Sequence, residues 1–234
     1  MKISSEILRK YLKEINCFGM INEVKLNFED NGVSALVMSV DNITMVSNKL
    51  SNSDFIKYEK IGAIVIDNLS VFIRILERFK DDIVLKKEEN FLKIFNENRE
   101  CDFVLVSEDF VEGVKKIPEI KYKNILKIDS EIIKESIRNS KIMGDVFSTI
   151  KFDLKDKTLI IECGETTKIT DKHKLNEKYE NCFVKFSAEF LEKTIFNLDG
   201  EIELSLGKDL PIKIVKTTDN TNLFYIIAPR VENE

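Results

Sequence analysis

An internal duplication constrains the fold of this chain more than any other feature of its sequence. On the two sides of residues Val111–Ile125, helical and strand-like patterns follow one another in the same order. The two halves agree in the order of these patterns more than in residue identity, but the first helical segment of each half begins with Ser-Glu-Ile. Self-similarity of this kind is typical of tandem structural repeats. We therefore predict two domains of similar size, residues 1–110 and 126–234, joined by a connecting loop at residues 111–125.

The first half alternates between helical and strand periodicity. Residues 5–15 place Leu8, Leu12 and Ile15 at helical spacing, and a second helical pattern begins at Asn68. Strand-like runs occupy residues 23–28, 33–40, 42–50, 55–58, 63–66, 82–86, 91–96 and 101–107, with a turn signal at residues 29–32. This order predicts two helices packed on one face of an antiparallel sheet.

The second half repeats this arrangement. Helices are predicted at residues 130–141 and 187–197. Strands are predicted at residues 148–154, 158–163, 166–175, 182–186, 201–206, 211–216 and 223–228, with a turn at residues 155–157. We therefore predict an α+β fold made of two tandem repeats, each with an antiparallel sheet and two helices.

Three of the four predicted helices carry basic residues opposite their apolar sides. These residues are Arg9, Lys10 and Lys13 in the first helix, Arg74, Arg78 and the adjacent Lys80 in the second, and Lys134, Arg138 and Lys141 in the third. The fourth helix departs from this pattern, because its outward positions are Glu189, Glu192 and Lys193. The chain has a net charge of -5. An affinity for phosphate groups would therefore depend on where the charges lie, not on their total.

The sequence contains no motif for nucleotide binding or metal coordination. There is no GxxxxGK[ST] phosphate loop and no Cys-x-x-Cys pair, and the four cysteines lie far apart. The single His173 lies among charged residues, where we expect a solvated side chain. We therefore predict that the protein is not an enzyme and uses no metal or cofactor.

The sequence also gives no sign of a membrane partner. No apolar run approaches the roughly 18 residues of a membrane-spanning helix. The N-terminal residues alternate charged with apolar side chains and do not form the apolar core of a signal peptide. We therefore expect an intracellular protein.

Three short segments, in order, connect the duplicated pattern to a known family. They are Gly32–Leu50 (GVSALVMSVDNITMVSNKL), Ile117–Tyr122 (IPEIKY) and Phe224–Glu234 (FYIIAPRVENE). In these segments and over essentially its full length, the chain resembles the sliding clamps of the proliferating cell nuclear antigen (PCNA) family. The resemblance implies a trimeric ring around duplex DNA, with the helices lining the hole and the sheets outside. It also implies a processivity factor of replication and repair, located in a prokaryotic cytoplasm or nucleoid, a nucleus or a viral factory.

The resemblance implies a role for three groups of residues. The basic helical residues named above, with Lys193, would contact the phosphates of double-stranded DNA without reading its sequence. A pocket for peptides of DNA polymerase, clamp loader, ligase and nuclease would be lined by Met38, Ile43, Met45, Ile117, Pro118, Tyr122, Pro211, Ile226, Ala228, Pro229 and Val231. The subunit interface would join Cys101, Phe103 and Leu105 of one copy to Thr167, Ile169 and Asp171 of the next.

Several alternatives are compatible with the sequence. The apolar residues of the connecting loop could pin the loop to its own domain instead of binding a partner. The chain could also be a monomeric processivity factor or one subunit of a heterotrimeric ring. Ring closure depends on edge strands whose partner the sequence does not identify.

Overall fold

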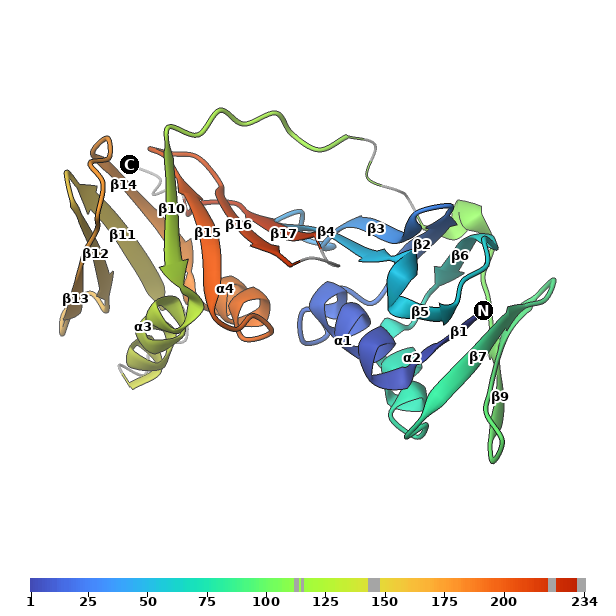
Figure 1. Cartoon of the computed structure of the whole chain (residues 1–234). Coiled ribbons are helices and arrows are strands. Elements are labelled where there is room, and N and C mark those ends of the chain that lie inside the picture. The colour runs from blue at the N-terminus through green and yellow to red at the C-terminus, as the bar shows by residue number, and fades with distance from the viewer. Residues whose placement is uncertain (112–113, 115, 143–147, 219–221, 231–234) are drawn as a thin grey trace. The chain divides into compact units, whose positions relative to one another are not determined.

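The computed structural model describes residues 1–234 except 112–113, 115, 143–147, 219–221 and 231–234. The described chain divides into two units, Met1–Ile117 with Thr217–Leu223 and Pro118–Lys216 with Phe224–Glu234. The predicted α+β class is confirmed, because antiparallel sheets carry two described helices in each unit (Figure 1). The boundaries predicted at residues 110 and 126 stay a prediction.

Two helices and two groups of strands build the first unit. α1 (Ser5–Asn16) contacts α2 (Leu69–Leu76) and lies against one of the strand groups. That group has the order β4 (Thr44–Ser51), β3 (Gly32–Met38), β2 (Val24–Glu29) and β6 (Gly62–Ile66). The other has the order β5 (Phe55–Lys57), β1 (Lys2–Ser4), β7 (Asp82–Lys87), β8 (Phe91–Phe95) and β9 (Glu100–Val104). The short helices η1 (Asn52–Asp54) and η2 (Glu108–Phe110) connect these elements.

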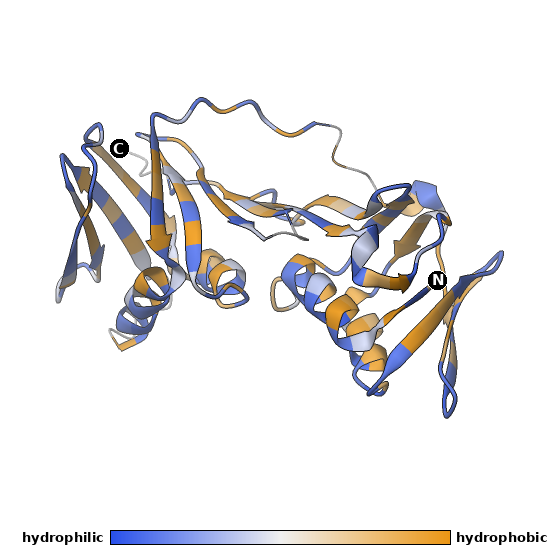
Figure 2. Ribbon diagram, viewed as in Figure 1, coloured by the Kyte–Doolittle hydropathy of each residue, from blue (hydrophilic) through white to orange (hydrophobic). Residues whose placement is uncertain are grey.

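The amphipathic pattern of α1 explains where the helix packs. Leu8, Leu12 and Ile15 are buried, whereas hydrophilic residues occupy the other side of the helix (Figure 2), where Glu6, Lys10 and Lys13 are exposed. The helix ends at Cys17, which adopts a left-handed conformation with a φ of 47°. The Cys17 amide donates to the Lys13 carbonyl over 3.2 Å, which satisfies one of the last carbonyls of the helix.

The turn between β2 and β3 requires a glycine. Gly32 has a φ of +130°, a conformation that residues with a Cβ rarely adopt. A Cβ at this position would lie 2.1 Å from the Leu50 carbonyl oxygen on β4. Gly32 therefore has two roles: it forms the turn, and it leaves room for β4 beside the β2–β3 hairpin.

The second unit is also built from two helices and two groups of strands. α3 (Ser130–Ile142) and α4 (Ala188–Ile195) contact each other. One group of strands has the order β10 (Asn124–Asp129), β15 (Glu201–Leu206), β16 (Ile212–Thr217) and β17 (Asn222–Ile227). The other has the order β13 (Ile169–Lys174), β12 (Thr158–Cys163), β11 (Thr149–Lys155) and β14 (Cys182–Ser187). Among the described helices, none has the length and apolar character needed to cross a membrane.

The element order confirms the predicted duplication. The series from β10 to β17 with α3 and α4 matches the series from β1 to β9 with α1 and α2, and β5 is an addition in the first unit. The strands β1 and β10, which directly precede α1 and α3, were not predicted. β10 begins at Asn124, two residues inside the predicted connecting loop.

The two predicted strands that lose three residues at one end both lie at the edge of a sheet. The strand predicted at residues 101–107 ends at Val104 as β9, because the chain then turns into η2. The strand predicted at residues 166–175 begins only at Ile169 as β13. Edge strands are paired on one side, which leaves their ends less constrained than those of central strands.

Candidate functional site

The first unit presents six of the predicted basic residues on and next to its two helices. We call Arg9, Lys10, Lys13, Arg74, Arg78 and Lys80 the first helical face. All are exposed except Arg9, which is half-buried. The apolar sides of α1 and α2 are occupied by the core, so the cations remain on the sides that face solvent.

The carboxylate of Glu77 joins the two helices of this face. Lys13 Nζ lies 2.8 Å from Glu77 Oε1, which connects α1 to the end of α2. The Lys13 hydrogen bond and charge lower the pKa of Glu77, and Arg9 and Arg78 lower it further. Three cations therefore act on one carboxylate, and the cluster keeps a net positive charge.

The second unit carries the remaining basic residues, which we call the second helical face: Lys134, Arg138, Lys141 and Lys193. Lys134 differs from its prediction, because its side chain is only 8% exposed and its Nζ lies 2.8 Å from Asp199 Oδ1. The helical pattern could not reveal this contact, because Asp199 lies 65 residues further along the chain. Lys134 is therefore not part of an exposed cationic surface.

The connecting loop is anchored within the second unit through Tyr122. Its hydroxyl donates to the Pro211 carbonyl over 2.9 Å, and burial raises the pKa of Tyr122 to about 12. Two residues further along the chain, the Asn124 side chain donates to the Glu180 carbonyl over 3.0 Å and accepts from the Glu180 amide over 2.8 Å. Pro118 is exposed and Pro211 is half-buried, so both have accessible surface.

The other predicted peptide-binding residues differ in exposure. Met38, Ile43, Ala228 and Pro229 are half-buried, and Ile117 is 40% exposed. Met45 and Ile226 are core residues, only 4% and 7% exposed. Strand periodicity could not predict this, because β4 and the end of β17 are buried on both sides. Val231 lies outside the described residues.

The predicted subunit-contact residues lie on or beside two edge strands. β9 and β13 each lie at one end of the strand order of their sheets. Phe103 faces inward, where its ring lies 4.8 Å from that of Phe72, and Asp171 accepts a 3.2 Å hydrogen bond from Asn139. Cys101 and Ile169 are half-buried, while Leu105 and Thr167 lie just outside the strands.

The exposed sides of these two edges carry residues that the sequence interpretation did not select. On β9 they include Asp102 and Val104, and on β13 they include Lys172 and Lys174. None of these three charged residues has an ion-pair partner in the described part of the chain. The two-residue alternation of each strand was the signal that could have identified them.

Cysteine and histidine side chains add no reactive cluster to the described residues. Burial raises the pKa of Cys163 to about 11, and its thiol donates to the Ser136 carbonyl over 3.1 Å. His173 is half-buried rather than solvated as predicted, because it shares the inward side of β13 with Asp171. Among the described residues, no group of histidine, cysteine, aspartate or glutamate could hold a metal ion.

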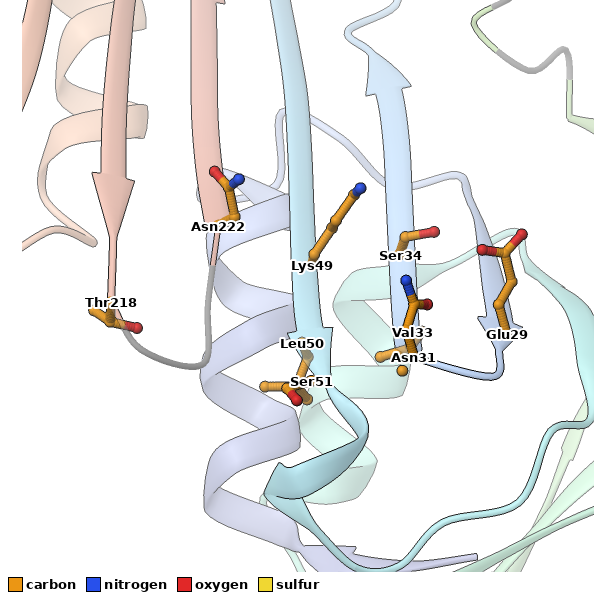
Figure 3. A pocket seen from close by; sticks show the side chains of 10 residues that line it. Glu29, Asn31, Val33, Ser34, Lys49, Leu50, Ser51, Thr218 and Asn222 are labelled. Atoms are coloured by element: carbon orange, nitrogen blue, oxygen red, sulfur yellow. The ribbon is translucent and has the colours of Figure 1, made fainter.

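A polar depression of about 220 Å³ lies beside the β2–β3 turn of the first unit (Figure 3). It is lined by Glu29, Asn31, Gly32, Val33, Ser34, Lys49, Leu50, Ser51, Thr218 and Asn222. These residues offer hydroxyl, amide and charged groups but no nucleophile held next to a base. The depression is therefore a surface feature without the arrangement of an active site.

Comparison with known proteins gives a consistent result over the whole chain. No protein-family model matches it. It is 26% identical to the DNA polymerase sliding clamp of Methanococcus maripaludis, with 96% of this chain and 97% of the relative covered. It is also 26% identical to DNA polymerase sliding clamp 1 of Thermococcus kodakarensis, with 91% of each covered.

Solved structures show the same fold. The PCNA of A. fulgidus, solved with the C-terminal region of FEN-1 bound, superposes with a TM-score of 0.87 at 20% identity and covers 100% of this chain and 99% of its own. The PCNA of Entamoeba histolytica superposes with a TM-score of 0.82 at 16% identity, and 98% of each chain is covered.

Proposed function

Because this chain belongs to the PCNA family of DNA sliding clamps, which are processivity factors and not enzymes, we propose that three copies form a ring around duplex DNA. In this ring the helices of both units line the hole and the sheets form the outside. The observation that carries the proposal is the duplicated unit with exposed cations on its helices, because cations that contact only phosphates allow movement along any sequence. The protein would act inside the cell, where it is bound to DNA.

The ring would tether other replication and repair proteins through short peptides. The PCNA of A. fulgidus binds the C-terminal region of FEN-1, and we propose that tails of polymerase, ligase, nuclease and clamp loader bind this chain in the same manner. The proposed contacts are Met38, Ile43, Ile117, Pro118, Tyr122, Pro211, Ala228 and Pro229, all of which have accessible surface. Met45 and Ile226 are left out because they lie in the core.

Self-association would occur between β9 of one copy and β13 of the next. Each is an edge strand, so its outward backbone groups can pair with another chain. The two edges differ, and such a head-to-tail contact closes into a ring when the rotation between copies allows it. Cys101, Phe103, Leu105, Thr167, Ile169 and Asp171 would support this contact from on or beside the two strands.

Two measurements test the proposal. Sedimentation equilibrium of the purified chain should give a mass of three copies, whereas a monomer would favour the alternative of a processivity factor without a ring. With a clamp loader and polymerase of an archaeal relative, primer extension on a primed circular template should give longer products when the chain is present. Products of unchanged length would contradict the processivity role.

A further inference from the structure

The first and second helical faces differ in charge, although the duplication makes them structural counterparts. The six cations of the first helical face share residues 5–16 and 69–80 with only Glu6, Glu14 and Glu77. Glu14 does not belong to the exposed surface, because it is buried and accepts a 2.9 Å hydrogen bond from Asn48. The four cations of the second helical face share residues 130–142 and 188–199 with Glu131, Glu135, Glu189, Glu192 and Asp199. The first face is therefore positive, and the second is not.

Each cation of the second helical face lies next to a carboxylate. Lys134 pairs with Asp199 at 2.8 Å, Arg138 with Glu135 at 3.0 Å and also with Glu131, Lys141 with Glu192 at 2.5 Å, and Lys193 with Glu189 at 2.6 Å. The Lys141–Glu192 pair joins α3 to α4, so the acidic residues of the fourth helix neutralise a cation of the third. This is the helix whose acidic positions departed from the sequence pattern.

The first helical face is arranged differently. In the described part of the chain, no carboxylate lies within ion-pair distance of Lys10, Arg74 or Lys80, and all three side chains are exposed. Glu77 is shared among several cations and does not neutralise the face. This face can meet a phosphate group without first breaking a contact within the protein at these three positions.

The difference decides which cations can bind DNA productively. A cation that neutralises a phosphate releases counterions from the duplex, and this release supplies most sequence-independent affinity. A cation held by a carboxylate must leave its partner, and the carboxylate then repels the same phosphate. Accepting the proposed function, we infer that the first helical face makes the phosphate contacts and that carboxylates mask the second helical face.

Two triple variants with the same change in total charge test this inference. The first is Lys10→Gln with Arg74→Gln and Lys80→Gln, and the second is Arg138→Gln with Lys141→Gln and Lys193→Gln. The affinity of the full chain for a fluorescent duplex is measured by anisotropy at several salt concentrations. Each lost phosphate contact lowers the slope of log affinity against log salt by about 0.9. The first variant should lower that slope by two or more, and the second by less than one.

A third variant tests the masking directly through a gain of binding. Glu131→Gln, Glu135→Gln and Glu192→Gln release Arg138 and Lys141 while leaving every cation in place. This variant should bind the duplex more tightly than the wild type and show a steeper salt dependence. The control is Glu23→Gln with Glu59→Gln and Glu97→Gln, which removes three exposed carboxylates elsewhere and should change affinity less.

The outcomes separate this inference from the proposed function. Equal slopes for the two cation variants, or no gain in the third variant, would overturn the inference while DNA binding itself stands. A wild-type chain that does not bind duplex at low salt would remove the proposed function and the inference together. Circular dichroism and sedimentation of each variant establish that the chain is folded and assembled as in the wild type.

Discussion

At the scale of single residues, Glu14 shows how burial sets the pH dependence of stability. Burial in α1 is the largest influence on its pKa and raises it above 4.5, while the Asn48 hydrogen bond and Lys10 act in the opposite direction. The folded state therefore holds the proton more tightly than the unfolded state. The free energy of unfolding must fall as pH rises from the unfolded pKa, near 4.5, through the higher folded pKa.

Replacing Glu14 with glutamine should remove this loss of stability. The carbonyl of the new amide side chain can still accept a hydrogen bond from Asn48, but it carries no charge. At neutral pH we expect Glu14→Gln to raise the free energy of unfolding, because the folded state then no longer buries a charged carboxylate. The gain should vanish below about pH 4, where both states of Glu14 are protonated. Urea unfolding across this pH range measures it, with Glu6→Gln, an exposed change in the same helix, as the control.

Tyr122 distinguishes the two interpretations of the connecting loop. Tyr122→Phe keeps the ring and removes the 2.9 Å hydrogen bond to Pro211, whereas Tyr122→Ala removes both. If the ring contacts a partner peptide, the alanine variant should bind at least tenfold more weakly, because such anchors contribute about 2 kcal/mol. The phenylalanine variant should stay close to wild type.

Calorimetric titration with the C-terminal peptide of a FEN-1-type nuclease makes this measurement. Tyr179→Ala changes a tyrosine of the second unit outside the proposed contacts and serves as the control. If Tyr122 only pins the loop, both Tyr122 variants should bind the peptide with the wild-type dissociation constant.

At the scale of elements, the sequence predicts those parts whose signals are local. The period of Leu8, Leu12 and Ile15 was sufficient for α1. β1 was missed because its three residues are too few to show a period. β10 was missed although it does show the two-residue period of a strand, with buried Leu126 and Ile128 alternating with exposed residues. Contacts between distant segments could not be predicted, because a local pattern carries no information about which residues the fold brings together. A helical pattern places Lys134 on a side of α3, but only the fold brings Asp199 to it.

The hydrogen-bond geometry of β9 predicts which proline substitutions separate assembly from folding. Leu105 N–H donates to Asn90 next to β8, so alternate amides, including that of Val104, point away from β8. Val104→Pro should therefore leave the unit folded but prevent pairing with another copy. Phe103→Pro removes an inward amide and should instead destabilise the unit. Sedimentation and thermal unfolding of both variants check this, and a Val104→Pro trimer would exclude β9 from the interface.

At the scale of the whole molecule, charge opposes assembly except where the two edges meet. Copies with a net charge of -5 repel one another, so a stable ring needs local attraction. Asp102 on β9 and Lys172 and Lys174 on β13 carry opposite charges on exposed sides and have no ion-pair partner in the described chain. If β9 and β13 pair between copies, these residues supply cross-strand attraction, which adjacent strands commonly use.

Exchanging the charges of Asp102 and Lys172 tests this attraction. Varying the salt concentration would not, because salt also screens the repulsion between the negatively charged copies. Asp102→Lys places like charges across the proposed contact and should weaken the association of copies by about tenfold, the effect of 1.4 kcal/mol. Lys172→Glu combined with Asp102→Lys restores opposite charges and should recover most of the loss. Glu23→Lys changes the net charge as much as Asp102→Lys but lies outside β9, so it should not weaken assembly. Sedimentation equilibrium measures all four proteins, and a double variant as weak as Asp102→Lys alone would show that these charges do not meet.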